Sequence, residues 1–137
     1  MDPIDSRIVK ILQSDSRKPF VEIGNEIGLS ESAVRRRVKN LTRREIIKKF
    51  TVEISGGDNT SAITLISVHS TSDTSAVSGK LMELAGVEVI YEITGQYDIA
   101  AVISAPSISQ INKCIDEVRK AEGVSDTNTV IILKTIR

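Results

Sequence analysis

Residues 19–41 read PFVEIGNEIGLSESAVRRRVKNL, and this stretch decides the fold of the N-terminal part of the chain. Pro19 can begin a short helix and Gly28 can end it, because proline suits the first turn of a helix and glycine suits the residue after the last turn. Ser30 can then cap a second helix, since its hydroxyl can accept a hydrogen bond from the first turn. The stretch predicts two helices joined by a short glycine-containing turn.

The residues before this stretch predict a further helix. Asp2 and Pro3 form a typical helix start, with an N-cap acceptor followed by proline. Each of the three predicted helices carries apolar residues at helical spacing, which gives it one buried face. These residues are Ile4, Ile8, Ile11 and Leu12 in the first helix, Phe20, Ile23 and Ile27 in the second, and Val34, Val38 and Leu41 in the third. Together the helices predict a helix-turn-helix domain over residues 1–50.

The third predicted helix concentrates positive charge. Residues 30–50 hold eight Lys or Arg residues against two acidic ones, whereas the whole chain is balanced at 18 of each. Taken alone, an arginine run is most simply a solvated basic face. The turn spacing, the Ser30 cap and the basic segment at Lys48 and Lys49 together favour DNA binding, because lysine and arginine pair with phosphates and arginine can grip a guanine edge.

Double-stranded DNA is therefore the predicted partner of this helix. Ser32 and Arg36 are the best candidates for base contacts, because residues near the N-terminus of a recognition helix reach deepest into the groove. Lys39 and Arg43 lie on the same side of the helix. The candidate DNA-binding residues are Ser30, Ser32, Arg35, Arg36, Arg37, Lys39 and Arg43, with Ser30 expected to act mainly as the helix cap.

The pattern changes after the third helix. Residues 46–54 predict an extended segment, and residues 55–61, SGGDNTS, predict a linker, since glycine and short polar residues favour loops. We therefore expect a linking strand and linker over residues 51–61 and a second domain over residues 62–137.

The second domain is predicted to be α+β. Strands are expected at residues 62–69, 87–94, 97–104 and 127–136, and helices at residues 74–84 and 107–120. The second and third strands are expected to meet at a tight connection through Gly95. The order β-α-β-β-α-β is that of the ferredoxin-like fold.

Three of these strands are apolar on both faces. On the second strand, Val87, Val89, Tyr91 and Ile93 are expected to point one way, and Ile90 the other way. Two helices can cover only one face of the sheet, so the other face would be a large exposed apolar surface. This pattern predicts a homodimer.

Several classes of protein and site are not indicated. There is no signal peptide, and no apolar run approaches the roughly 18–20 residues that span a bilayer, so a cytoplasmic protein without membrane contact is expected. Cys114 is the single cysteine, which excludes an internal disulfide, and His69 is the single histidine, which excludes a histidine-based metal cluster. No phosphate-binding loop, zinc spacing or nucleophile motif is present, so neither a metal nor an enzymatic activity is predicted.

The chain resembles the Lrp/AsnC family, the feast/famine regulators of bacteria and archaea, in three regions. The first combines DPIDSRIVKIL at residues 2–12, GLS at 28–30, VRRRVKNL at 34–41 and IIK at 46–48; the second is TGQYD at 94–98; the third is GVSDTNT at 123–129. The resemblance spans nearly the whole chain. It implies a winged helix-turn-helix, a short linking strand and a ligand-sensing βαββαβ domain of the RAM type, which forms dimers and then tetramers or octamers.

The same resemblance implies an amino-acid effector bound between dimers near residues 95–98. An α-amino acid needs a carboxylate for its ammonium group and N–H donors for its carboxylate; Asp98 can supply the first and the backbone at Gly95 the second. The alternative is that Gly95 makes the turn and Asp98 caps it. The candidate effector-binding residues are Glu92, Thr94, Gly95, Gln96, Tyr97 and Asp98. The carboxylates of Glu92 and Asp98 favour lysine or another small or basic amino acid, but Gln96 stands where many members carry Asp or Asn, so the effector stays open.

Two other functions are also open. An architectural DNA-binding protein would share the basic helix, but it would bind DNA with little sequence preference and would not respond to amino acids. A regulatory subunit of a metabolic enzyme could use the second domain as an amino-acid sensor, but this would leave the first 50 residues without a purpose.

Overall fold

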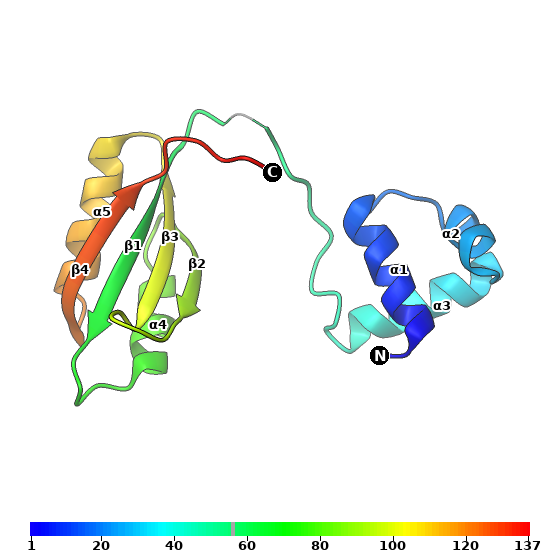
Figure 1. Ribbon diagram of the computed structural model, residues 1–137, viewed down its shortest axis with the longest axis horizontal. Helices are drawn as coiled ribbons and strands as arrows, with labels where there is room; N and C mark the ends of the chain where they lie inside the picture. Colours follow the sequence, from blue (N-terminus) through cyan, green and yellow to red (C-terminus); the bar gives the residue numbers. More distant parts are fainter. Residues whose placement is uncertain (56) are drawn as a thin grey trace. The chain divides into compact units, whose positions relative to one another are not determined.

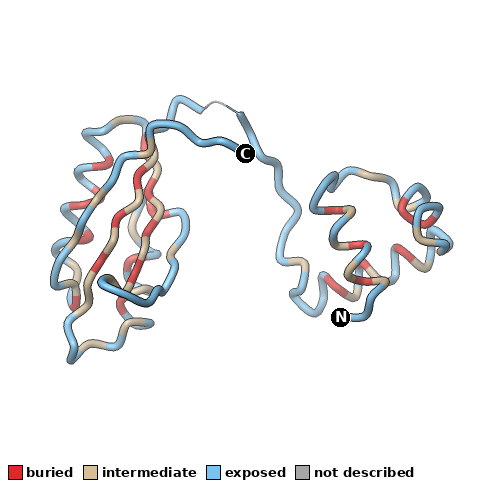
Figure 2. Tube along the Cα trace, viewed as in Figure 1, coloured by how far each residue is buried: buried red, intermediate tan, exposed pale blue. Residues whose placement is uncertain are grey.

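The computed structural model describes residues 1–55 and 57–137. Gly56, in the predicted linker, lies outside the described residues. The chain divides into two compact units, Met1–Ser55 and the remainder through Arg137 (Figure 1). Each unit has buried residues of its own (Figure 2), so each has its own core.

The N-terminal unit consists of the helices α1 (Pro3–Ser14), α2 (Phe20–Ile27) and α3 (Glu31–Arg43). The two predicted caps are formed. The carboxylate of Asp2 accepts a hydrogen bond from the N–H of Asp5 at 2.7 Å, and the hydroxyl of Ser30 accepts one from the N–H of Ala33 at 3.2 Å. The apolar faces of the helices meet in one core, whose buried residues are Ile8, Leu12, Ile23, Val34 and Val38.

The turn between α2 and α3 passes close to α2. Gly28 ends α2 in the left-handed conformation, at φ 76°, and the N–H of Leu29 bonds to the carbonyl of Gly24 at 2.9 Å. Gly24 is buried within α2, and a Cβ atom placed on it would overlap the carbonyl oxygen of Leu29. The turn therefore passes so close to Gly24 that no side chain fits at this position of α2.

The segment after α3 begins with a tight turn. Glu45 adopts a left-handed conformation at φ 57°, and the N–H groups of Ile46 and Ile47 both bond to the carbonyl of Leu41. Residues 46–54 pair with no other described residue of the chain as a strand. The helical N-terminal unit offers no sheet edge, and an extended segment needs one to pair its backbone N–H and C=O groups.

The C-terminal unit is an antiparallel sheet with two helices on one face (Figure 1). Its elements are β1 (Thr60–Val68), α4 (Thr74–Met82), β2 (Val87–Glu92), β3 (Ile99–Ala105), α5 (Ile108–Lys120) and β4 (Val124–Ile131). The strand order is β2-β3-β1-β4, which confirms the ferredoxin-like arrangement. The residues buried between sheet and helices include Ile66, Leu81, Ile99, Ile103 and Ile111.

The end of β4 lies beside the start of β1. Ala62 pairs with Ile131, and the N–H of Ile132 bonds to the carbonyl of Ser61 at 2.9 Å. The prediction placed this strand at residues 127–136, which is wrong at both ends. β1, the single neighbour of β4 in the described sheet, begins at Thr60, two residues before Ala62, so the residues beyond 133 have no strand to pair with.

A β-bulge changes the predicted face of Val87. The pairing of β2 with β3 shifts between Val87 and Val89, so Val87 packs with Ile90 against the core beneath the helices and is 8% exposed. The alternating pattern predicts Val87 on the opposite face, with Val89 and Tyr91. Strict alternation gave the wrong face because the bulge inserts Glu88 as an unpaired residue.

The second face of the sheet is apolar, and no helix of the C-terminal unit covers it within the described residues. Ile63 pairs with Val102 on one side and with Val130 on the other, and Leu65 lies two residues further along β1 on the same face. Tyr91 is 57% exposed and Val130 is 49% exposed. We refer to Ile63, Leu65, Tyr91, Val102 and Val130 as the open face of the sheet.

Candidate DNA-binding surface and ligand-binding loop

One face of α3 carries uncompensated positive charge. Arg36, Lys39 and Arg43 follow one another at helical spacing and are exposed, so their side chains lie on the same side of the helix. Within the described chain, neither Arg36 nor Lys39 forms an ion pair, and Arg43 donates a hydrogen bond to the neutral side chain of Asn40 at 2.7 Å. A hollow on the surface of α3 is lined by Arg36, Arg37, Lys39, Asn40, Thr42 and Arg43.

Ser30 and Ser32 lie at the start of α3. The hydroxyl oxygen of Ser30 caps the helix and lies 3.2 Å from that of Ser32. Ser32 is exposed one turn before Arg36. The cap is therefore a role for Ser30 inside the domain, whereas Ser32 shares the face of Arg36.

The charge of Arg35 is partly compensated inside the domain. Arg35 forms an ion pair with Glu31 one turn earlier in α3, and its guanidinium lies 5.5 Å from the centre of the Phe20 ring. Arg35 is one of the predicted DNA-binding residues. The structure shows that Arg35 differs from Arg36 in having a carboxylate and an aromatic ring as partners.

Arg37 bonds to the N-terminal end of α1. Its Nη1 atom donates hydrogen bonds to Oδ2 of Asp2 at 2.7 Å and to Oδ1 of Asp5 at 3.0 Å. The N–H of Asp5 and then the guanidinium of Arg37 lower the pKa of the Asp2 carboxyl, and the contacts with Asp2 and Asp5 raise the pKa of Arg37. The guanidinium predicted to contact DNA is thus held by two carboxylates of its own domain. These partners of Arg37 are not predicted from the sequence, where their only signal is the spacing of the two aspartates at the start of α1.

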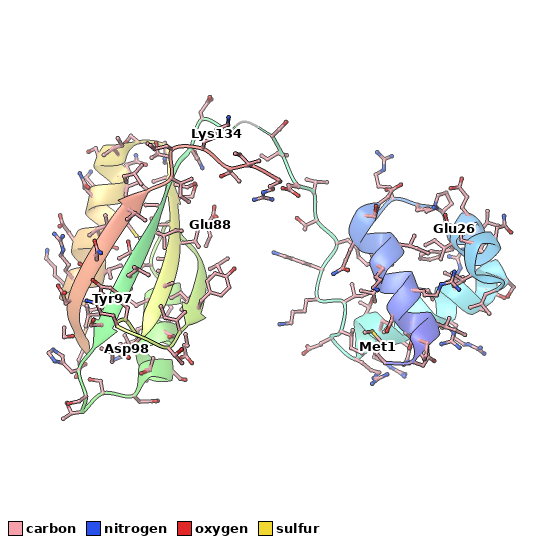
Figure 3. All side chains as sticks on the ribbon, viewed as in Figure 1. Met1, Glu26, Glu88, Tyr97, Asp98 and Lys134 are labelled. Carbon is pink, nitrogen blue, oxygen red and sulfur yellow. The ribbon has the colours of Figure 1, made fainter. Side chains whose placement is uncertain are left out.

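The candidate ligand-binding loop is the connection between β2 and β3, residues 93–98. It is longer than the predicted tight turn because β2 ends at Glu92 and β3 begins at Ile99. Gly95 adopts φ 117°, a backbone conformation that suits glycine. The N–H of Asp98 bonds to the carbonyl of Ile66, and Oδ2 of Asp98 accepts a hydrogen bond from the N–H of Val68, at 2.9 and 2.8 Å. Figure 3 shows Asp98 and the neighbouring Tyr97 at one end of the sheet.

The carboxylates of Glu92 and Asp98 bond to different elements of the C-terminal unit. Oε1 of Glu92 accepts a hydrogen bond from the hydroxyl of Ser78 on α4 at 3.0 Å, whereas Asp98 bonds to β1. Thr94, Gly95 and Gln96 are exposed, and Tyr97 and Asp98 are half-buried. Each carboxylate uses one oxygen in these bonds, so its second oxygen forms no hydrogen bond with the described residues.

Other kinds of site find no support in the described residues. No group of three or more His, Cys, Asp or Glu side chains among them could hold a metal ion. Cys114 is buried, and burial raises the pKa of its thiol, which suits the predicted packing role. No described helix has the length and apolar character that crossing a membrane requires.

Comparison with known proteins matches both units. A family model of the AsnC-type helix-turn-helix domain matches residues 1–42, and a model of the Lrp/AsnC ligand binding domain matches residues 61–137. The HTH-type transcriptional regulator LysM of Saccharolobus solfataricus is 39% identical over 135 residues, which cover 98% of this chain and 95% of that protein. The HTH-type transcriptional regulator FL11 of Pyrococcus furiosus is 37% identical over 137 residues, covering 98% and 90%.

A solved structure extends the comparison to a liganded protein. The feast or famine regulatory protein of M. tuberculosis complexed with L-methionine is 27% identical, with a TM-score of 0.87 over 99% of this chain and 94% of that chain. These relatives are named as regulators and not as enzymes, which agrees with the prediction that the chain has no enzymatic activity.

Proposed function

The chain belongs to the Lrp/AsnC family of transcriptional regulators, and on that premise we propose that α3 is the helix that enters the major groove of its DNA site. The observation that carries this proposal is the uncompensated charge of Arg36, Lys39 and Arg43 on one face of α3. Cations on one helix face can pair with phosphates along a groove, while residues near the helix N-terminus reach base edges.

Two roles follow for the residues of this face. Ser32 and Arg36 contact base edges, because they lie in the first turns of α3 and a guanidinium can bond two acceptors of a guanine. Lys39 and Arg43 contact phosphates. Arg35 is a weaker candidate for DNA contact because Glu31 compensates its charge.

Lys39→Ala should weaken binding to every DNA sequence alike and lower the slope of log K against log salt concentration by about 0.9, the value for one phosphate contact. Arg36→Ala should instead cost about 1–3 kcal/mol at one base position and relax the preference there. Titration of labelled DNA at several salt concentrations measures both effects. Lys113→Ala, which removes an exposed lysine from α5, is the matched control and should change neither. An unchanged slope for Lys39→Ala would remove Lys39 from the interface.

We further infer that residues 93–98 bind an α-amino acid that regulates the assembly or its DNA affinity. The L-methionine complex of the M. tuberculosis relative supports an effector of this class. Asp98 bonds to Val68 through Oδ2, which leaves Oδ1 for an ammonium group. The space beside Gly95 is open, with no atom within 4 Å of an added Cβ, so a ligand carboxylate can approach the backbone there. The second carboxylate, Glu92, favours lysine or another basic amino acid.

One or two amino acids at millimolar concentration should raise the Tm of the protein, because a ligand that binds only the folded state stabilises it by mass action, by about 2.7 kcal/mol at 100 times its Kd. Asp98→Asn should abolish the shift and keep the unliganded Tm, since an amide oxygen can still accept from Val68. Asp116→Asn removes the same charge from α5 and should keep the shift. If no amino acid shifts the Tm, the effector proposal is wrong and the architectural DNA-binding protein becomes the better account.

The open face of the sheet is proposed as the contact between two copies of the chain. Among the described residues, no helix of the C-terminal unit packs against these apolar side chains. Exposed apolar surfaces of this kind mark interaction sites. A two-fold contact between identical sheets buries the same side chains on both copies. The dimer then presents two α3 helices to half-sites of a pseudo-palindrome, about 34–36 Å apart.

A further inference from the structure

A charged network joins the start of α1 to the middle of α3. Asp2 accepts the N–H of Asp5 on Oδ1 and the guanidinium of Arg37 on Oδ2, and Arg37 also bonds to Oδ1 of Asp5. Arg37 lies on the recognition helix beside Arg36, but its two ion pairs cross to another helix. The network therefore connects the proposed DNA contacts to a part of the domain outside the helix-turn-helix itself.

The burial of Asp5 makes this network geometrically demanding. Asp5 is 7% exposed, and it is one of two buried polar residues in the described chain. A carboxylate removed from water needs a close and well-oriented partner, so only a narrow range of arrangements of α1 and α3 satisfies it. The apolar contacts of Ile8, Val34 and Val38 also hold these helices together. Hydrophobic attraction depends on buried area and is non-directional, so these contacts do not by themselves fix one orientation of α3.

We propose that Arg37 is a positioning residue for DNA recognition. Its ion pairs with Asp2 and Asp5 fix the rotation of α3 about its own axis, and this rotation decides which base edges Arg36 and Ser32 meet. Successive residues of a helix are about 100° apart, so holding Arg37 against α1 also holds the direction of Arg36. Arg37 contributes sequence preference and does not neutralise a phosphate. This inference rests on the proposed contact of α3 with DNA.

Removal of the charge of Asp5 distinguishes the proposed positioning role from a general electrostatic effect on DNA affinity. Asp5→Asn removes a negative charge from a DNA-binding domain, which by electrostatics alone raises its affinity for every sequence. If the carboxylate positions α3 through Arg37, the same variant loses affinity for its preferred site. The two accounts therefore predict opposite signs for one substitution.

The experiment uses the full chain and a DNA site that it selects from a random-sequence pool. Affinity for this site and for unrelated DNA is measured against salt concentration, at a temperature where circular dichroism shows each variant folded. For Arg37→Gln and Asp5→Asn we expect the ratio of specific to non-specific affinity to fall about tenfold, the scale of one base contact. The salt slope should stay at the wild-type value. Arg37→Lys keeps a cationic partner for the carboxylates, so it should retain most of the preference and serves as the variant that folds if Arg37→Gln does not.

Three results would overturn the proposal. One is a salt slope lowered by about 0.9 in Arg37→Gln with equal loss on both DNAs, which identifies a phosphate contact. Another is tighter binding of Asp5→Asn to both DNAs. The third is an unchanged ratio in both variants. Failure of the wild-type chain to select any site, by contrast, contradicts the proposed DNA recognition itself and is seen before any variant is made.

Discussion

Gly24→Ala is expected to unfold the N-terminal unit under conditions that leave the C-terminal unit folded, and so to abolish DNA binding. Alanine in place of glycine inside a helix normally stabilises a protein by up to about 1 kcal/mol. Here the added Cβ would overlap the backbone carbonyl of Leu29, and no side-chain rotation can relieve a clash with backbone. The turn must then move away from α2, which separates α2 from α3 and breaks the bond from Leu29 to Gly24.

The expected loss is roughly 3 kcal/mol, the upper end for overpacking. A unit of this size has a free energy of unfolding of about 3–8 kcal/mol on the usual scale per residue. The substitution therefore removes much of the stability of the N-terminal unit. Circular dichroism during heating, together with proteolysis of the N-terminal unit, measures the effect. Gly79→Ala is the matched control, because Gly79 lies in α4 with open space around it and the substitution should stabilise the protein slightly. Wild-type stability of Gly24→Ala would show that the turn does not pass as close to α2 as described.

Leu65→Lys should convert the proposed dimer to monomers and reduce the affinity for a pseudo-palindromic site. Leu65 lies on β1, an inner strand of the sheet, and its side chain is on the open face. In a monomer the lysine ammonium reaches water and the fold is retained. In a sheet-to-sheet dimer two ammonium groups would be buried without partners, which is among the costliest changes an interface can undergo.

We expect the Kd of the dimer to rise at least about 100-fold, which corresponds to about 2.7 kcal/mol. Sedimentation equilibrium over a range of protein concentrations measures this change, and the Tm of the variant at low concentration checks that the monomer is folded. Asn112→Lys places the same charge on the exposed side of α5 and should leave the dimer intact. A dimer of unchanged affinity in Leu65→Lys would mean that the two copies meet elsewhere.

The parts of the fold that could be predicted depend on signals that act over a few residues. Asp2 and Ser30 cap α1 and α3 as predicted, because a cap bonds to backbone within its own first turn. The face of Val87 and the end of β4 could not be predicted, because each depends on pairing with a strand far away in the sequence. Residues 46–54 are predicted to be extended, but the pairing of an extended segment also needs a neighbouring strand, and the local sequence does not specify that neighbour.

The same distinction applies to the candidate sites. Helical spacing was enough to place Arg36, Lys39 and Arg43 on one side of α3, since that spacing is a property of the helix alone. It did not show that Arg37 is held by Asp2, which is 35 residues away in the sequence. For Asp98 the sequence is compatible with effector binding and with a structural bond. The bond to Val68 shows that the side chain has a structural partner, and one carboxylate can serve both purposes.

The pairing of Ala62 with Ile131 brings the two ends of the ligand-binding unit to the same edge of its sheet, with the N–H of Ile132 bonded to the carbonyl of Ser61. A domain whose chain enters and leaves at one place can be inserted into a surface loop of a host protein or joined at either terminus without being pulled apart. The C-terminal unit is thus transferable between architectures. Evolution, or an engineer building a biosensor, can attach it to a new output domain through a single point and leave residues 93–98 at the far end of β1 undisturbed.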